Sequence, residues 1–467
     1  MTSQIKTKLI VSRFYFVAAL SLIAIVLGST QISSQNIDTV AFERITVIPM
    51  DRERTLTAQT VVVQNGRITD LGPADSVEIP FGATRINGDG RFLLPTLAEM
   101  HAHISSSFTA PYAAGRFQTP LQAIERVLLM YVLNGIGTIR NMIGEPIHIE
   151  LREKASRGEI ISPTIYTAGP PFSGATVQTV EAAIEMVASQ KASNYDFIKT
   201  FPGMPSLEIF NTVARTAREL GIPIAGHVPS TVGLDNALAA KIQTIDHLDG
   251  YLQAAVEPGA PSPAFWGENL APYVNELRFP QLVAKTKAAG TWMVPTQSLL
   301  ESDFAPDPPA VLLQRPEMVY VAPRLREQWT RTKTSTDNLY SPEHRAKFIT
   351  LRQQLIKLLH EAGVGFILGS DAPQNWSVPG FSIHRELVAL VESGLTPYQA
   401  LATGTYNVAN FTGTLEQTGT IEVGKRADIL ILDANPLINI SNSSSIVGVM
   451  LNGQWLPQTK LEEMINE

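Results

Sequence analysis

Two histidines stand two residues apart at the end of an apolar run, and this spacing suggests a shared chemical role. The run is LLPTLAEMHAH, residues 93–103, and it carries His101 and His103. If the run is a β-strand, both side chains lie on the same face, roughly 6 to 7 Å apart along the chain. Two imidazoles placed in this way are either packed core histidines or half of a metal site.

Four further residues with side chains suited to a metal site occupy comparable positions later in the chain. Each stands at or near the end of its own short apolar run: Lys199 in DFIKTF, His227 in PIAGHVP, His247 in TIDHLDG and Asp371 in FILGSDAP. Any one of them alone is explained as a hydrogen-bonded core residue. Six such groups at strand ends are costly to bury without a shared partner, so we expect them to surround metal ions.

The residue types at these positions predict hydrolytic chemistry. Imidazole and carboxylate groups suit zinc and related divalent ions, and the absence of cysteine from the sequence excludes thiolate ligands. A bound divalent ion polarises a carbonyl and lowers the pKa of bound water toward neutrality, so hydroxide is available at physiological pH. Asp371 could bind one ion, take the proton of that water and pass it to the leaving group.

The segment that carries these residues alternates strands with helices. Between about 93 and 410, eight short apolar runs are separated by amphipathic stretches such as LEIFNTVARTAREL. Eight strand–helix alternations predict an α/β protein with a parallel (β/α)8 TIM barrel. Because active sites of such barrels lie at the carboxyl ends of the strands, the six residues would converge on one mouth.

The two ends of the chain have a different pattern. Residues 36–92 and 411–467 contain short predicted strands, with Asn-Gly turn signals at 65–66 and 452–453. We predict that both ends pair into one small β-sandwich that flanks a barrel of residues 93–410.

Residues 1–35 have the pattern of a targeting segment. Basic residues precede the apolar stretch FYFVAALSLIAIVLG, and small polar residues follow it. This order predicts a signal peptide and export to the periplasm or the cell exterior, and an uncleaved N-terminal membrane anchor is the alternative.

Charge and composition limit the classes of binding partner that we expect. The formal net charge of −7 offers no extended basic face, so nucleic acid is not an expected partner. We expect a small-molecule or dipeptide-like substrate and contact with a membrane only through an uncleaved anchor. The sequence leaves a homo-oligomer open.

Two segments interrupt the strand–helix rhythm, at about 251–278 and about 300–345. Both follow predicted strands on the face where barrel active sites lie, so we expect them to form lids or substrate walls. The alternative is that they only pack against the rim of the barrel.

The ordered set HAH, IK, GH, DH and SDA, followed by TGTIEVGKRADILILDANPL, resembles the amidohydrolase superfamily. Within it, the chain resembles the secreted imidazolonepropionase-like and Xaa-Pro dipeptidase-like hydrolases over about residues 40 to 458. The sequence departs from the usual pattern at Thr96, where glycine is common, and at Glu99, where aspartate is common. Both departures lie behind the predicted ligands and concern strand packing more than metal binding.

The resemblance implies two divalent metal ions, with zinc expected, and assigns their ligands. One ion would be bound by His101, His103 and Asp371, and the other by His227 and His247. The amine of Lys199 would be carboxylated by carbon dioxide and would bridge the two ions. This reaction needs a neutral amine, which burial favours because it lowers the pKa of lysine.

Lys199 also separates the subfamilies. Imidazolonepropionases bind a single metal and lack the bridging lysine, so its presence argues against that reaction.

Two further residues are candidates for substrate binding. Arg140, in GTIRNM, ends the second predicted strand and could hold a substrate carboxylate with its planar guanidinium. A structural salt bridge is the alternative. His384, in FSIHREL, resembles a position near the metal centre in the family, and a histidine that packs a helix is the alternative.

The predicted function is that of an exported binuclear metal-dependent hydrolase. It would cleave the amide bond of a small substrate such as an Xaa-Pro dipeptide or an N-acyl amino acid, using metal-bound hydroxide and Asp371 as proton shuttle. A lactonase or phosphotriesterase-like hydrolase is the alternative among enzymes. Outside enzymes, the alternative is an inactive metal-binding periplasmic scaffold. A cationic group that binds a substrate carboxylate would favour the peptidase function. An apolar pocket without a cationic group would favour the ester-hydrolysing function.

Overall fold

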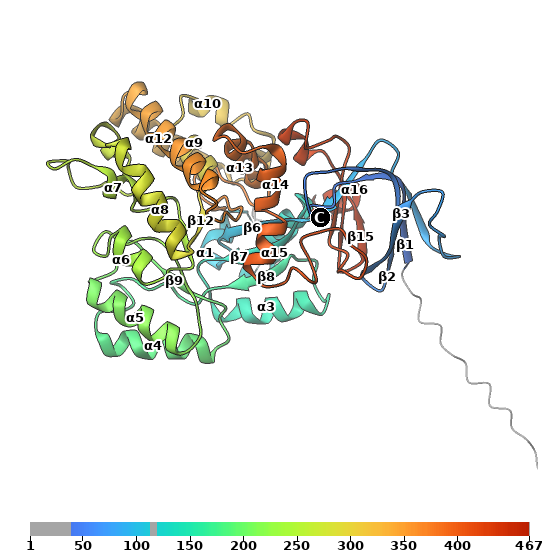
Figure 1. The fold of residues 1–467 in the computed structure, drawn as a ribbon, viewed down its shortest axis with the longest axis horizontal. Coiled ribbons are helices and arrows are strands. Elements are labelled where there is room, and N and C mark those ends of the chain that lie inside the picture. Colours follow the sequence, from blue (N-terminus) through green and yellow to red (C-terminus); the bar gives the residue numbers. More distant parts are fainter. Residues whose placement is uncertain (1–38, 113–118, 467) are drawn as a thin grey trace, which may run out of the picture. The chain divides into compact units, whose positions relative to one another are not determined.

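The computed structural model describes residues 39–112 and 119–466 (Figure 1). The predicted signal peptide or anchor at 1–35 lies outside these residues. In the described part of the chain, no helix combines the length and the apolar character needed to cross a membrane.

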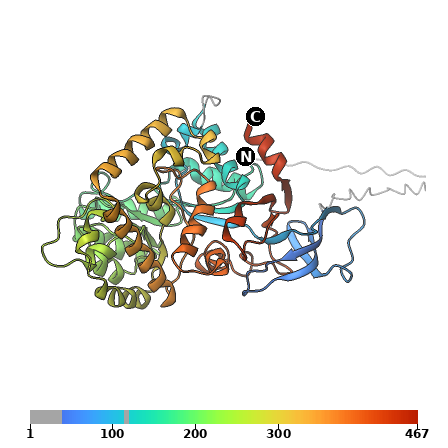
Figure 2. The same ribbon diagram turned by 90° about the horizontal axis from the view of Figure 1, so that it is seen from above.

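Strands from both ends of the chain form one eight-stranded sheet, in the order β15-β14-β13-β5-β1-β2-β3 with β4 paired to β1. Its strands are β1 (Thr39–Val47), β2 (Leu56–Gln64), β3 (Arg67–Pro73), β4 (Thr84–Asn87), β5 (Phe92–Pro95), β13 (Ile429–Leu432), β14 (Ile446–Leu451) and β15 (Gln454–Pro457). The predicted turns at 65–66 and 452–453 join β2 to β3 and β14 to β15, and all four of their residues have the positive φ of a type I′ turn. Figure 2 shows the N-terminal strands in blue beside the C-terminal segment in red.

This sheet curls back on itself. The backbone N–H of Ile68 in β3 donates to the carbonyl of Lys425 at 3.0 Å, just before β13, and Gly424 N–H donates to Ile68 at 2.8 Å. The enclosed core contains Phe42, Val61, Ile429 and Met450, all fully buried. The predicted small β-sandwich made by both ends of the chain is therefore confirmed.

Between these ends, the parallel strands close into a ring. They form two sheets, ordered β6-β7-β8 and β12-β11-β10-β9. The strands are β6 (Leu97–Ala102), β7 (Ile136–Asn141), β8 (Thr164–Thr167), β9 (Ile198–Thr200), β10 (Ile224–Gly226), β11 (Thr244–Asp246) and β12 (Trp292–Val294). A parallel bridge between Ala168 and Phe197 joins β8 to β9.

The eighth predicted strand is present as an extended segment that makes only single bridges. Phe366 pairs with Met293 of β12, and Ala372 pairs with Ala102 of β6, both in parallel. This segment completes the ring and confirms the predicted (β/α)8 barrel.

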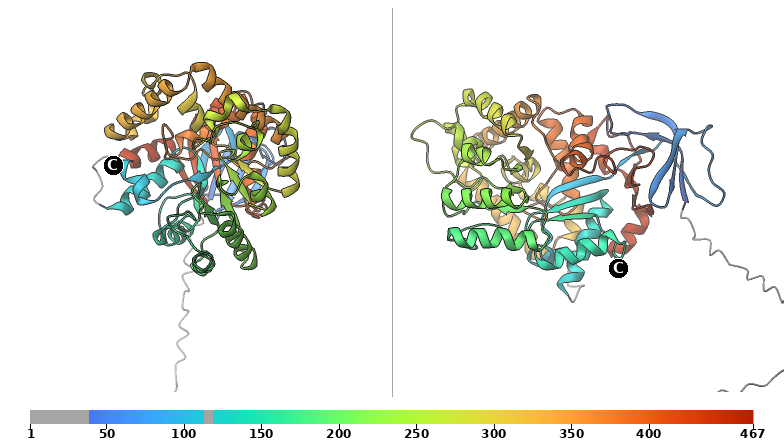
Figure 3. Two further views of the ribbon diagram at one scale, coloured as in Figure 1. Left: turned by 90° about the vertical axis from the view of Figure 1, so that its left-hand side faces the viewer. Right: turned by 60° about the horizontal axis from the view of Figure 1, so that its bottom comes forward.

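Helices alternate with the barrel strands and lie around them (Figure 3). They include α2 (Pro120–Leu133), α3 (Pro146–Ser156), α4 (Val180–Ala192), α5 (Leu207–Glu219), α6 (Leu234–Ala239), α8 (Phe279–Ala289), α12 (Pro342–Glu361) and α13 (Phe381–Glu392). In α5, Ser206 caps the first turn by accepting from Ile209 N–H, and Ile209, Val213 and Ala217 share one buried face. Three helices follow toward the C-terminus: α14 (Pro397–Thr403), α15 (Tyr406–Phe411) and α16 (Gln458–Asn466).

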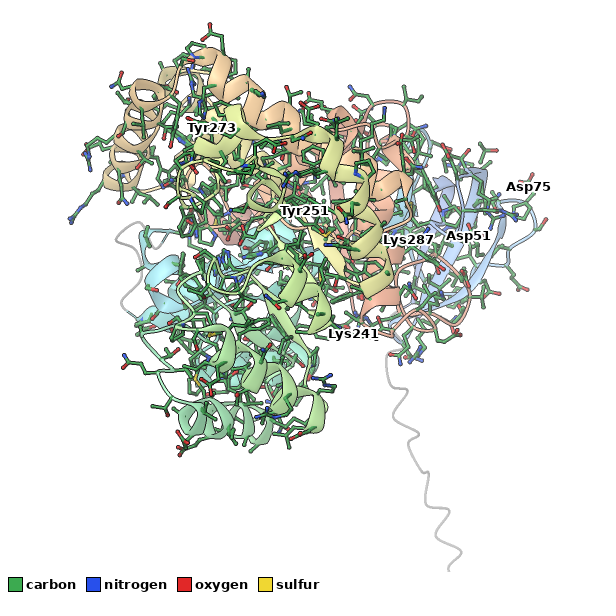
Figure 4. The ribbon with its side chains drawn as sticks, turned by 60° about the vertical axis from the view of Figure 1, so that its left-hand side comes forward. Asp51, Asp75, Lys241, Tyr251, Tyr273 and Lys287 are labelled. Atoms are coloured by element: carbon green, nitrogen blue, oxygen red, sulfur yellow. The ribbon has the colours of Figure 1, made fainter. Side chains whose placement is uncertain are left out.

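The two interrupting segments differ in structure. The first, 251–278, contains α7 (Tyr251–Ala255) and two short 3-10 helices, η2 (Glu268–Tyr273) and η3 (Glu276–Arg278). Figure 4 labels Tyr251 and Tyr273 near its two ends. Tyr251 is buried and its hydroxyl contacts that of Thr286 at 2.6 Å, whereas Tyr273 is 46% exposed.

The second segment, 300–345, is mainly helical rather than an open loop. It contains most of α9 (Gln297–Phe304), then α10 (Pro309–Leu312), η4 (Pro316–Tyr320), α11 (Pro323–Leu339) and the start of α12. The described residues form one compact unit, so the internal domain boundaries at 92/93 and 410/411 stay predictions.

Candidate metal centre

Four histidines from three barrel strands meet at the carboxyl ends of those strands. His101 lies in β6 and His103 directly follows it, and His227 and His247 directly follow β10 and β11. The ring centroid of His247 lies 4.6 Å from those of both His101 and His227, and the rings of His101 and His103 are 5.3 Å apart. None of the four is more than 5% exposed. The structure thus brings together the histidines that the sequence placed at one mouth.

Asp371 completes a compact three-residue site. One of its carboxylate oxygens, Oδ1, lies 2.7 Å from His103 Nε2 and 3.4 Å from His101 Nε2. One ligand atom from each of His101, His103 and Asp371 can be chosen so that all lie within 4.8 Å of one another. Two imidazoles and one carboxylate at this spacing form a divalent metal site.

The other two histidines also present a nitrogen for a metal. His227 Nδ1 is 2.7 Å from Asp249 Oδ2, and His247 Nδ1 is 2.8 Å from the hydroxyl of Thr296. These contacts orient the rings and leave each Nε2 available. His247 Nε2 is buried and has no hydrogen-bond partner among the described residues, which is unfavourable unless an ion binds it. The residues therefore fit a bound metal.

Lys199 lies beside the cluster, on β9. It is fully buried, and its Nζ is 3.1 Å from Asp246 Oδ2. Burial lowers the pKa of Lys199, although Asp246 and Asp371 partly oppose the shift, and a lowered pKa favours the neutral amine. Gly226 has a φ of 118°, and a Cβ there would lie 2.6 Å from Lys199 Cδ, so the lysine depends on a glycine at this position.

Asp246 is a functional residue that sequence reasoning missed. Its Oδ2 lies 3.1 Å from both His101 Nδ1 and Lys199 Nζ, and its Oδ1 accepts from the hydroxyl of Thr244 at 3.0 Å. Burial alone would raise the pKa of Asp246, but Lys199 and His101 bring it well below its ordinary value. The anionic carboxylate favours a proton on His101 Nδ1, which leaves Nε2 free for a metal.

Three residues at the centre have a backbone conformation that non-glycine residues rarely adopt. His247, Thr296 and Asp371 have φ values of 62°, 48° and 60°. Such left-handed residues cost free energy and cluster at functional sites. At His247, the conformation also ends the strand alternation, so that Asp246 and His247 both reach the centre.

Arg140 does not form the predicted carboxylate clamp. It is only 2% exposed, and both terminal nitrogens donate to the hydroxyl of Thr244, at 3.3 and 3.4 Å. Its guanidinium carbon lies 4.2 Å from the centre of the Phe197 ring. Arg140 therefore lies inside the barrel and supports Thr244, which in turn donates to Asp246.

His384 also lies away from the metal centre. Its Nε2 donates to the carbonyl of Asn134 at 3.2 Å, and its Nδ1 accepts from the hydroxyl of Ser443 at 3.0 Å. Asn134 stands just before β7, at the end of that strand opposite the mouth. Because both ring nitrogens have these partners, the structure favours the alternative of a histidine that packs a helix.

Glu99, the departure from the usual aspartate, joins two strands behind the site. Its Oε1 accepts from the backbone N–H of His101 at 3.0 Å and from that of Ser370 at 2.9 Å. Burial raises the pKa of Glu99 to about 8. The residue holds β6 against the segment that carries Asp371.

Comparison with known proteins agrees with this geometry. The model of the amidohydrolase family matches residues 92–456, so the chain belongs to this family. The predicted superfamily resemblance is confirmed, and the protein is a metal-dependent hydrolase that acts on carbon–nitrogen bonds, with a metal site at His101, His103 and Asp371.

Individual relatives are distant. Adenine deaminase 2 of Shouchella clausii (strain KSM-K16) is 26% identical over 183 residues, which are 38% of this chain and 31% of that protein. The match thus spans less than a third of the relative.

Two solved structures share the fold over most of both chains. An Xaa-Pro dipeptidase with methionine bound in its active site has a TM-score of 0.65 and 17% identity, covering 90% of this chain and 100% of that one. Molinate hydrolase has a TM-score of 0.68 and 17% identity, covering 92% and 97%. At these identities the likeness concerns the fold, and the substrate must be argued from the site.

Proposed function

We propose that this protein hydrolyses the amide bond of a small substrate, such as an Xaa-Pro dipeptide or an N-acyl amino acid, with two divalent metal ions. The observation that carries the proposal is the convergence of Asp371 with four buried histidines beside a buried lysine. The fold shared with an Xaa-Pro dipeptidase supports the choice of substrate class.

Each residue has a defined task in this proposal. One ion would be held by His101, His103 and Asp371, and the second by His227 and His247. Carboxylated Lys199 would be a ligand shared by the two ions, and zinc is the expected metal. When bound, the ions polarise the scissile carbonyl and lower the pKa of the attacking water.

Asp371 moves the proton. Burial alone would raise the pKa of Asp371, but His101 and His103 lower it below its ordinary value, so the group is ionised at neutral pH. An ionised carboxylate at the centre can accept the proton of the attacking water. It then returns that proton to the leaving nitrogen, which departs as a neutral amine.

A second candidate function follows from Arg140. Because its guanidinium is directed to Thr244 inside the barrel, it does not supply the cationic clamp that a free substrate carboxylate would need. This observation favours a lactonase or phosphotriesterase-like reaction, which uses the same metal chemistry on an uncharged ester.

A substrate panel with and without chelator tests both candidates. The metal-loaded enzyme is offered dipeptides, N-acyl amino acids, lactones and phosphotriesters. We expect amide turnover that a chelator abolishes and zinc restores, with about two ions per chain by elemental analysis. Turnover of esters alone would favour the second candidate, and turnover that survives complete metal removal would contradict both.

We also propose that the chain is exported to the periplasm or the cell exterior. The support is the basic and apolar pattern of residues 1–35. Cell fractionation tests it, and a protein that remains in the cytosol with an intact leader would contradict it.

A further inference from the structure

Aromatic rings from three separate segments face the metal centre. Phe108 stacks on His103 with ring centroids 4.7 Å apart, Phe201 meets the ring of His227 edge-on at 5.3 Å, and Trp266 meets that of His247 edge-on at 5.1 Å. A fourth ring, that of Phe265, lies 4.5 Å from Trp266 and 6.3 Å from His227. The metal-binding imidazoles are therefore bordered by an aromatic wall, defined by Phe108, Phe201, Phe265 and Trp266.

The aromatic wall is partly exposed to solvent, whereas the histidines beside it are buried. All four aromatic residues keep part of their surface accessible, and Phe265 is 58% exposed. Exposed aromatic surface beside a catalytic centre is unfavourable in water and becomes favourable when an apolar group of a ligand covers it. The wall thus has the character of a binding surface rather than of core packing.

Hydrogen bonds hold the Phe265–Trp266 turn in place. Ala264 N–H donates to Asn269 Oδ1 at 2.7 Å, and Trp266 N–H donates to Glu268 Oε2 at 3.1 Å. Glu268 is in turn joined to the mainly helical segment 300–345, because its Oε1 accepts from the hydroxyl of Tyr340 at 3.3 Å. The rings are positioned before a ligand arrives, which reduces the entropy lost on binding.

Two rings of the wall, Phe265 and Trp266, belong to the segment 251–278, which we expected to form a lid or a substrate wall. We infer that the substrate carries an apolar ring, preferably aromatic, next to the scissile carbonyl, and that Phe265 and Trp266 select for it. The inference rests on the proposed hydrolysis only for the position of the carbonyl. The same wall would select an aromatic ester or lactone.

Ligand binding tests the inference without turnover. The metal-loaded enzyme is titrated with phenylacetate and acetate, two acids that it cannot hydrolyse, by calorimetry, as wild type and as the variants Phe265→Ala, Phe265→Leu and Leu277→Ala. Leu277 is the matched control, since it belongs to the same segment and is 89% exposed.

We expect phenylacetate to bind about tenfold more tightly than acetate, which corresponds to one good aromatic contact. Phe265→Ala should remove most of this preference, Phe265→Leu should keep part of it, and Leu277→Ala should leave it unchanged. Metal content should equal that of wild type in all variants, because Phe265 is not a ligand. Equal affinity for the two compounds, no binding of either, or full preference in Phe265→Ala would overturn the inference.

Turnover in the same variants separates this inference from the proposed function. Phe-Pro is compared with Gly-Pro, and a phenylacetate ester with an acetate ester. If no amide is cleaved but the ring preference persists in binding and in the ester series, the proposed function fails and the inference stands. If amides are cleaved with no ring preference, the inference fails alone.

Discussion

The barrel mouth and the terminal sheet are both assembled from short strands, yet they bury opposite kinds of side chain. The mouth buries histidines, Lys199 and Asp246, and it leaves His247 Nε2 without a hydrogen-bond partner among the described residues. The sheet encloses apolar side chains and keeps ion pairs such as Arg85–Glu43 at its surface. The sheet therefore gains stability from its own packing, whereas the mouth needs a bound ion to offset the cost of its buried polar groups.

Among the tests of this contrast, Asp371→Asn should have the largest effect. The amide keeps the shape of the carboxylate but loses its charge and its ability to accept a proton. We expect kcat/KM for the best substrate to fall about a thousandfold or more. The thermal unfolding midpoint of the metal-free protein should not fall. Retention of a tenth of the activity would show that another group moves the proton.

Phe42→Ala tests the other region. Phe42 is fully buried in the sheet, and its ring meets that of Trp455 edge-on at 5.3 Å. We expect a loss of about 3 to 5 kcal/mol in unfolding free energy, measured by denaturant titration. Metal affinity of the folded variant should equal that of wild type. A parallel fall in metal affinity would mean that the two regions are energetically coupled, and the contrast would not hold.

Asp246→Asn tests a residue that orients the metal ligand His101 without being a proposed ligand itself. The amide cannot hold the Nδ1 proton of His101 as the anion does, so we expect metal affinity to fall about 10- to 100-fold. Competition with a chromophoric chelator measures it. Asp249→Asn is the matched variant, because it removes the corresponding partner of His227. Wild-type affinity in Asp246→Asn would show that this carboxylate does not position His101.

The sequence predicted which side chains converge at the mouth because each one stands at or near the end of an apolar run, and parallel strand ends must meet at one edge of a barrel. It missed Asp246 for a local reason. Strand alternation puts neighbouring residues on opposite faces, so a sequence that places His247 in the mouth places Asp246 outside it. The left-handed φ of His247 breaks this rule, and nothing in the sequence TIDH marks that conformation.

Arg140 and His384 were misplaced for a different reason. Arg140 was predicted from its place at a strand end and His384 from its resemblance to a family position, but their partners Thr244, Ser443 and Asn134 come from distant segments. Long side chains reach several ångströms from the backbone, so chain position alone does not determine what they contact. The aromatic wall was equally hidden, since its rings come from three segments without a common motif.

Asp303→Asn should have the smallest effect of these variants. It sharpens the comparison between the mouth and the rest of the molecule, because Asp303 is a buried acid outside the proposed ligand set. It lies on α9, is 5% exposed, and its Oδ2 accepts from Asn375 at 3.4 Å. Burial raises the pKa of Asp303 to about 7. A pKa raised above its unfolded value means that the folded protein binds this proton more tightly. Its contribution to stability is therefore complete below about pH 4 and is lost as the pH rises toward 7.

Asparagine is neutral at every pH, so the variant should lose less stability than wild type between pH 4 and pH 8. Urea midpoints measured across this range give the difference. Asp235→Asn is the control, because Asp235 is 66% exposed in its ion pair with Lys285, and its profile should match that of wild type. A profile of Asp303→Asn that also matches wild type would mean that Asp303 ionises at no cost in the folded state. In that case, burial of a polar group without an ion would not by itself distinguish the mouth from the rest of the barrel.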